Sequence, residues 1–370
     1  MERLLSTIKR TPLYAVHKAS GARMIPFGGW EMPVEYSGIA KEHSAVRTTA
    51  GLFDVSHMGE FEIRGPEALD LVQYITSNDA SKLVDGQAQY SAMPYPHGTA
   101  VDDLLVYRHS AEHFILVVNA ANISKDFEWI NSHNRVDAGV EDVSDDTTLL
   151  ALQGPKAIDI LQPLTHTQLR DLKYYHFEHG KILNVDAIVS RTGYTGEDGF
   201  ELYFSAAESE LVWKGLLEAG APSGLVPAGL GARNTLRLEA RYLLYGNDMD
   251  GTTTLLEAGL GWIVNFEKGD FIGRDALLKQ KQEGVKRRLV GFEMIGKDIA
   301  RDHYPAFVHG REAGHVTSGA PSITLKKNIG LAYLPAEYAS IGTTFHVGVR
   351  SKFSEARVVR TPFYKREVHQ

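Results

Sequence analysis

The sequence predicts an α+β protein with a ferredoxin-like unit near the middle of the first half and a small antiparallel β-barrel or sandwich at the C-terminal end. Two observations lead to this prediction. Residues 59–145 give strand, helix, strands, helix and strand in that order, which is the ferredoxin-like pattern. Residues 288–364 contain short strands separated by glycine-rich turns, a spacing typical of small all-β domains.

Size and composition limit the classes of function. A chain of 370 residues favours two or three domains. Lys plus Arg number 39 and Asp plus Glu number 46, so the net charge of −7 gives no reason to expect a nucleic-acid or membrane-surface binder. The chain has no cysteine, which excludes disulfides, Cys-ligated zinc, iron–sulfur clusters and thiol nucleophiles. No apolar run approaches the roughly 20 residues that a membrane-spanning helix needs.

The N-terminal stretch, residues 1–20, is mildly basic and lacks the apolar block of a secretory signal. We therefore expect a cytoplasmic protein. The basic charge of this stretch does not by itself exclude a short transit-like leader.

The elements of the ferredoxin-like unit can be justified in order. "GEFEIR" alternates with period two and predicts a strand, and Pro66 then opens a helix, at a position where its missing N–H costs nothing. A second helix carries Ile123, Phe127 and Ile130 on one face. The remaining strands are expected at 87–93, 101–107, 114–119 and 140–143.

Residues 145–275 mix strands and helices. Ser205 and Glu208 form a capping box that predicts a helix ending at Gly220. A later helix from about Leu230 would carry Arg233, Arg237 and Arg241 at i, i+4 and i+8. Such a stripe is usually a solvated face, but an arginine near the helix start is less expected because the dipole there disfavours positive charge. Arg233 is therefore the most suggestive of the three.

The segment "HSAEH", residues 109–113, has the H-x-x-E-H form of some zinc proteases. That motif needs a helix, whereas this segment falls in a tight turn between two expected strands. We therefore expect no metal site here. The chain also lacks a P-loop and a G-x-S-x-G elbow.

Two carboxylate positions are candidates for chemistry. Alternation along "VDDLLVY" puts Asp103, Leu105 and Tyr107 on one face of a strand and Asp102 on the other. Either both aspartates close a turn after Gly98, or one is aimed into a pocket.

Glu201 lies on a strand whose apolar face is formed by Phe200, Leu202 and Phe204. It is either a solvent-facing carboxylate or a ligand-binding one. Glycines at 193, 196 and 199 precede it and would let the backbone approach a ligand closely.

Together these stretches resemble one family, the aminomethyltransferase or T-protein of the glycine cleavage system. The motifs that carry the resemblance are "FGGWEMP", "GLFDVSHMGE", "DDLLVY", "SRTGYTGEDGFE", "PAGLGARNTLRLEA", "LYGNDMD" and "GDFIGRDAL". They run in order from about residue 10 to the C-terminus, and several are ten residues or longer.

The resemblance implies a three-domain cloverleaf around a central folate channel, with a ferredoxin-like middle domain and a C-terminal antiparallel β-barrel. In this sequence the first, discontinuous domain would comprise residues 1–52 and 141–275. The ferredoxin-like domain would comprise residues 53–140 and the barrel residues 285–370.

The resemblance also implies an activity. The family transfers the methylene group from the aminomethyl-dihydrolipoyl arm of H-protein to tetrahydrofolate, giving 5,10-methylenetetrahydrofolate and ammonia. Tetrahydrofolate would be the cosubstrate, and lipoylated H-protein would be the partner, with the P- and L-proteins in the same complex. The alternative within the fold is a folate-binding relative that does not transfer aminomethyl groups.

The motif matches carry the family's site residues onto this chain. Asp103 corresponds to the catalytic aspartate, while Asp102 is expected to be structural. The folate-binding positions are Glu201, Arg233, Tyr90, Met58, Tyr107, Asn119 and Tyr194. Lys365 or Arg366 would lie near the channel mouth, where either could meet the glutamate tail of the folate.

Overall fold

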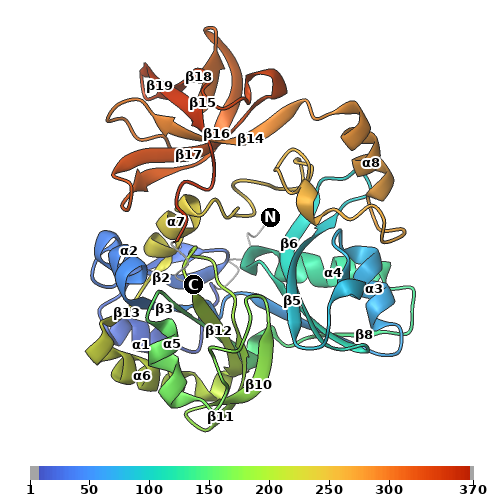
Figure 1. Ribbon diagram of the computed structural model, residues 1–370, viewed down its shortest axis with the longest axis vertical. Coiled ribbons are helices and arrows are strands. Elements are labelled where there is room, and N and C mark those ends of the chain that lie inside the picture. Colours follow the sequence, from blue (N-terminus) through green and yellow to red (C-terminus); the bar gives the residue numbers. More distant parts are fainter. Residues whose placement is uncertain (1–7, 367–370) are drawn as a thin grey trace, which may run out of the picture.

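The computed structural model describes residues 8–366, so the first seven residues of the basic N-terminal stretch lie outside the described part. Three β-sheet units surround the centre of the molecule, and long segments without regular structure connect them (Figure 1). The first two units come from the first two thirds of the chain, and the third comes from its last quarter.

A six-stranded sheet forms the first unit, with the strand order β10-β11-β12-β9-β3-β13. Its buried side chains pack on α5, α6 and the N-terminal α1, and Trp213 of α6 is the largest of them. The strands are β3 (Ala50–Asp54), β9 (Thr147–Gln153), β10 (Phe177–Ile182), β11 (Val185–Ser190), β12 (Gly199–Ser205) and β13 (Leu225–Pro227). The helices are α1 (Tyr14–Ala19), α2 (Ile39–Thr48), α5 (Ala157–Leu161), α6 (Ser209–Gly220) and α7 (Leu230–Glu239). A hairpin of β1 (Arg23–Phe27) and β2 (Trp30–Glu35) lies between α1 and α2 in the chain.

A five-stranded sheet forms the second unit, with the order β5-β6-β7-β4-β8. Without the edge strand β5, its order and its two helices are those of a ferredoxin-like fold, as the sequence predicts. The strands are β4 (Gly59–Arg64), β5 (Gln87–Pro94), β6 (Ala100–Ser110), β7 (His113–Val118) and β8 (Gly139–Asp142). Helices α3 (Ala68–Ile75) and α4 (Ile123–His133) cover one face and bury Ile123 and Ile130.

The third unit is a closed barrel, which confirms the predicted C-terminal architecture. Its strands are β14 (Arg287–Met294), β15 (Pro305–Val308), β16 (Arg311–Ser322), β17 (Lys327–Pro335), β18 (Thr344–Val349) and β19 (Lys352–Val359). Strand β15 is hard to predict from the sequence, because it has only four residues, begins with Pro305 and pairs with β16 through an irregular register. Helix α8 (Arg274–Glu283) precedes the barrel in the chain.

The same Gly-Pro turn joins a strand to a helix in both sheets. Gly65 and Gly154 have φ angles of +134° and +136°. A Cβ at either position would lie 2.7 Å or 2.5 Å from a backbone carbonyl oxygen of another segment, so only glycine fits. In the first turn Pro66 precedes the helix, which begins at Ala68 rather than at the proline.

Two helix predictions need correction. The α7 helix ends at Glu239, and Arg241 lies beyond it with a left-handed φ of 59°, so the arginines do not form one stripe. Ser205 accepts a hydrogen bond from Ala207 N and caps a single 3₁₀ turn, after which α6 begins at Ser209. The predicted end of α6 at Gly220 is confirmed.

Buried charges join α7 to the barrel. Arg237 is 2% exposed and pairs with the buried Asp248, whose other oxygen accepts from the hydroxyls of Thr317 and Ser318 on β16. This contact brings α7, the segment around residue 248 and the barrel together. The segment from Leu243 to Phe271 shares a core with barrel residues and with β5 and β6. The predicted domain boundaries stay a prediction.

Within residues 8–366, we find no helix of the length and apolar character that a membrane crossing demands.

The ion pair between Arg237 and Asp248 gives a test of the fold. Arg237→Met leaves a buried carboxylate without its cation, and we expect the free energy of unfolding to fall by about 3–5 kcal/mol. Urea unfolding of both proteins measures the change. Arg170→Met is the control, because the pair Arg170–Asp159 is 74% and 62% exposed and should contribute little. Equal losses in the two variants would contradict the role assigned to Arg237.

Candidate functional site

A cavity of about 450 Å³ lies where the two sheets, α7 and the segment after α7 meet. Its volume is typical of a small-molecule site. Most of the wall is apolar or aromatic, with a few charged groups at separate places. The charged residues among those that line it are Asp103, Glu201, Arg233 and Arg241, and the aromatic ones are Tyr90, Tyr175, Tyr194, Tyr203, Tyr242 and Trp262.

Asp103 enters the cavity from the middle of β6, where it pairs across the sheet with Ala92. The Tyr90 hydroxyl donates to Asp103 Oδ2 at 2.7 Å, and Asn119 Nδ2 donates to Oδ1 at 2.9 Å. Asp102 points to the other face and is fully buried, where it accepts from Asn119 N at 3.0 Å and Nδ2 at 2.8 Å. The two aspartates lie inside a strand and do not close a turn, and their opposite faces are as predicted.

The surroundings of Asp103 favour its protonated form. Burial, and then the neighbouring charge of Asp102, raise the pKa of Asp103 to about 7, although the hydrogen bonds from Tyr90 and Asn119 lower it. A carboxyl group with this pKa can both accept and release a proton near neutral pH.

Glu201 lies on β12 with its carboxyl group toward the cavity, because Phe200 and Leu202 occupy the opposite, core face. It is only 8% exposed, so the solvent-facing interpretation is wrong. Thr192 Oγ1 donates to Glu201 Oε2 at 2.5 Å. Burial raises the pKa of Glu201, while Thr192 and the charge of Arg233 lower it.

Arg233 projects from the first turn of α7 into the same cavity. Its guanidinium carbon lies 4.7 Å from the centre of the Tyr194 ring, a cation–π distance. Among the described residues its side chain has no hydrogen bond or ion pair. Burial lowers the pKa of Arg233, and the charges of Tyr194 and Glu201 raise it. The guanidinium is thus held beside a carboxylate and an aromatic ring with its donors available to a ligand.

Seven of the eight predicted site residues line the cavity: Met58, Tyr90, Asp103, Asn119, Tyr194, Glu201 and Arg233. Tyr107 is the exception. It is 2% exposed and lies behind the wall, where its hydroxyl is 3.0 Å from that of Tyr203 and 3.2 Å from Thr192 Oγ1. Tyr107 therefore does not itself line this cavity, since Tyr203 from β12 lies between them, and its assignment as a folate-binding residue stays a prediction.

Sequence reasoning missed several lining residues. Tyr203 lies two residues after Glu201 on β12 and therefore on the same face of the strand, so this spacing could have identified it. Arg241 lies in an irregular segment and Trp262 in a single 3₁₀ turn (Gly261–Ile263), where no periodicity indicates the direction of a side chain. At the C-terminal end Pro362 lines the cavity, while Arg366 lies 3.5 Å from the Asp198 carboxylate. Lys365 is exposed.

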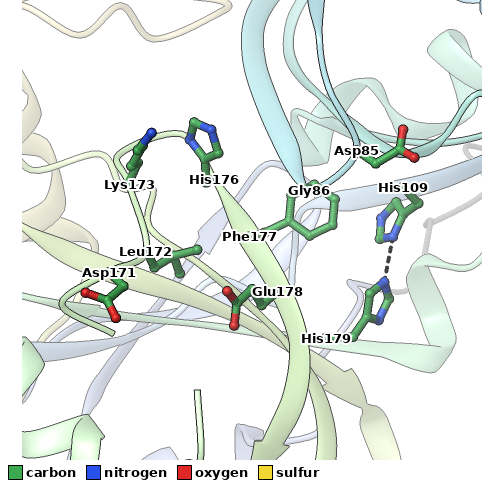
Figure 2. A pocket seen from close by; sticks show the side chains of 10 residues that line it. All are labelled: Asp85, Gly86, His109, Asp171, Leu172, Lys173, His176, Phe177, Glu178 and His179. Atoms are coloured by element: carbon green, nitrogen blue, oxygen red, sulfur yellow. Dashed lines mark hydrogen bonds between the residues drawn. The ribbon is translucent and has the colours of Figure 1, made fainter. Parts of the chain in front are cut away.

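A second cleft, of about 500 Å³, opens at the joint between the two sheets, away from Asp103 (Figure 2). The Phe177 backbone N–H donates to the Gly86 carbonyl there at 2.8 Å, and His109 Nδ1 lies 2.8 Å from His179 Nε2. Burial, and then the charge of His113, lower the pKa of His109 to about 3. Across the described residues no three His, Cys, Asp or Glu side chains are grouped to hold a metal ion. The cleft offers no catalytic constellation comparable to that around Asp103.

Comparison with known proteins gives the class of protein that this fold and cavity define. Residues 13–268 match the model of the GCVT N-terminal domain, and residues 287–365 match that of the glycine cleavage T-protein C-terminal barrel domain. The chain therefore belongs to the T-protein family of the glycine cleavage system, which confirms the resemblance drawn from its motifs.

Named relatives match this sequence over nearly its whole length. Proteins named aminomethyltransferase from Desulfitobacterium hafniense and Symbiobacterium thermophilum are 52% and 53% identical to it, covering 98% and 97% of this chain and 100% and 98% of their own. The crystal structure of the glycine cleavage system aminomethyltransferase T from Bartonella henselae is 33% identical, with a TM-score of 0.92 over 97% of this chain and 98% of that one.

The raised pKa of Asp103 predicts a pH-dependent stability. An unfolded aspartate titrates near pH 3.9, so between about pH 4 and 7 the folded chain holds a proton that the unfolded chain has released. This contribution to stability is present below pH 4 and is lost as the pH rises through 7. We expect Asp103→Asn to be more stable, relative to the unchanged protein, at pH 8 than at pH 4.5.

Thermal unfolding at the two pH values measures this difference. Asp159→Asn, at a carboxylate that is 62% exposed, is the control and should show no such change. The same stability difference for Asp103→Asn at both pH values would contradict the raised pKa.

Proposed function

We propose that this member of the T-protein family transfers the methylene group of an aminomethyl unit, carried on the lipoyl arm of H-protein, to tetrahydrofolate. The observation that carries the proposal is the carboxyl of Asp103, hydrogen-bonded to Tyr90, in a cavity that also contains Glu201 and Arg233, whose guanidinium has no hydrogen-bond partner among the described residues. The products would be 5,10-methylenetetrahydrofolate, ammonia and the dihydrolipoyl group. The two N–H hydrogens that the folate loses would leave in the ammonia and in the thiol.

Asp103 would be the catalytic residue. The folate nitrogen N5 attacks a carbon that is losing an amine, so positive charge develops along the path. A carboxylate beside it stabilises that charge and can accept the proton that N5 releases. Its pKa of about 7 gives both protonation states at neutral pH, as proton transfer in both directions requires.

Glu201 and Arg233 would hold the pterin ring. The pterin presents an exocyclic amine beside a ring N–H, and one carboxylate can accept both hydrogen bonds in parallel. Thr192 orients the Glu201 carboxyl by donating to one of its oxygens. The ring of Tyr194 and its stacked neighbour Tyr242, with centroids 5.6 Å apart, supply flat surfaces suited to the pterin and benzoyl rings.

The remaining partners and the cellular location are proposed from the chain's membership of the T-protein family. Lipoylated H-protein would deliver the aminomethyl group, and the P- and L-proteins would act in the same system. We propose that the protein works in the cytoplasm. Lys365 stays a candidate for the folate tail, whereas Arg366 has a carboxylate partner in Asp198. The main alternative, a folate-binding relative without transfer activity, has less support because the relatives that match over the full chain are named aminomethyltransferases.

Turnover with purified components tests the proposal. Ammonia release should depend on both aminomethylated H-protein and tetrahydrofolate. Asp103→Asn should lower kcat by about 10²–10⁴-fold, because it removes a positioned proton acceptor, and leave folate affinity nearly unchanged. Asp102→Asn should be milder, since Asp102 does not face the cavity. Folate binding without ammonia release by the unchanged protein would instead favour the non-transferase relative.

Folate affinity tests the second carboxylate. Glu201→Gln replaces an acceptor of two hydrogen bonds by a group with only one acceptor atom. A hydrogen bond to a charged group is worth about 1.5–3 kcal/mol, so the Kd for tetrahydrofolate should rise roughly 10–100-fold. Tyr107→Phe is the matched control, because Tyr107 lies behind the wall and its loss should change the Kd much less. Calorimetric titration gives both values, and equal effects would refute the assigned contact.

A further inference from the structure

Arg241 is a second guanidinium in the cavity, and the proposed chemistry does not use it. It lines the cavity just after the end of α7, and its side chain is half-buried. Among the described residues its only hydrogen bond is the one that Nη2 donates to the Ala258 carbonyl oxygen at 3.3 Å, and no carboxylate there pairs with it. A guanidinium has five N–H donors and keeps its charge in proteins, so most of these donors are available to an anionic ligand.

The backbone and a neighbouring segment hold Arg241 against the wall of the cavity. Its φ of 59° lies in the left-handed region, which residues with a Cβ rarely adopt and glycine adopts freely. The guanidinium passes directly over Gly259, where a Cβ would lie 2.7 Å from Arg241 Nη2. A non-glycine residue in a strained conformation beside a cavity suggests that its side chain has a function there.

The groups along α7 follow the order of the parts of a folate. Arg233 and Glu201 lie where the pterin would bind, and the Arg233 guanidinium lies over the ring of Tyr194. That ring stacks with Tyr242, which Arg241 precedes in the chain. At the rise of a helix, Arg241 lies roughly 12 Å beyond Arg233. A pterin, a benzoyl ring and a glutamate would therefore meet a carboxylate, an aromatic pair and a second guanidinium in turn.

Arg241 also lies toward the open side of the cavity. The segment that accepts its hydrogen bond at Ala258 continues to Trp262, which lines the cavity although it is 69% exposed. Glu201, at the pterin end, is only 8% exposed. The glutamate of a folate carries its carboxylates, which are costly to remove from water, so this part of the ligand belongs at the exposed side.

We propose that Arg241 binds a carboxylate of the first glutamate of tetrahydrofolate through two parallel N–H donors of its guanidinium. The identity of this ligand rests on the proposed function. The C-terminal candidates are less well placed, because Lys365 is exposed and Arg366 lies 3.5 Å from the Asp198 carboxylate. Arg241 is then a specificity-determining residue, which distinguishes folates with a glutamate tail from pterins without one.

Two ligands that differ in the tail test this contact. They are tetrahydrofolate and tetrahydropteroyl methylamide, which keeps both ring systems and the amide but has no carboxylate. In Arg241→Gln, calorimetric titration should show the Kd for tetrahydrofolate rising about 10–100-fold, as the loss of a charged hydrogen bond predicts, while the Kd for the methylamide stays nearly unchanged. Arg288→Gln, at an exposed position on β14, removes the same charge away from the cavity and should alter neither Kd.

Arg241→Gly repeats the measurement in a variant that suits the left-handed backbone, so the test does not depend on whether Arg241→Gln folds. Equal rises for the two ligands, or no rise for tetrahydrofolate, would overturn the inference. A tail-dependent rise in Lys365→Met in place of the Arg241 variants would do the same. If the unchanged protein binds neither ligand, the proposed function fails and this inference with it, whereas binding that ignores position 241 refutes only the inference.

Discussion

The site depends on one constraint, the placement of two adjacent carboxyl groups on opposite faces of a strand that is buried on both sides. Asp102 faces the helices of the five-stranded sheet, and Asp103 faces the cavity. Each loses water, and each lies within the field of the other. The strand cannot slide to relieve this, because a shift of one residue would turn every side chain of β6 to the wrong face. The structure thus retains a costly charge arrangement, which the proposed proton transfer would use.

The opposite wall of the cavity depends on α7. Its first turn presents Arg233 to the cavity, and its last turns carry Arg237 and Glu239, which are buried in contacts with the barrel. Glu239 accepts hydrogen bonds from Ser322 on β16 and from the segment that follows it. Because these groups are desolvated and fully paired, they fix the orientation of the helix. The barrel therefore takes part in placing Arg233, although it supplies none of the charged groups in the cavity.

Much of this could be predicted from the sequence. Period-two alternation predicted which face of its strand Asp102, Asp103 and Glu201 each occupy, because successive side chains of a strand point to opposite faces. The role of Tyr107 could not be predicted, since its place behind Tyr203 depends on how two sheets meet. Arg241 lies in an irregular segment and Trp262 in a single 3₁₀ turn, where only tertiary packing sets the direction of a side chain. The burial of Arg237 could not be predicted for a similar reason. Its partner Asp248 lies in a loop, and Ser318, which also contacts it, lies in the barrel, far away in the sequence.

We infer that burial and the charge of Asp102 hold a proton on the Asp103 carboxyl near neutral pH. Carbon-13 NMR of the protein labelled at its aspartate carboxyls measures this directly, with Asp103→Asn used to assign the signal. We expect a titration midpoint near pH 7 that moves to lower pH in Asp102→Asn. A midpoint near pH 4, the ordinary value of a solvent-exposed aspartate, would show that neither burial nor Asp102 holds the proton on Asp103.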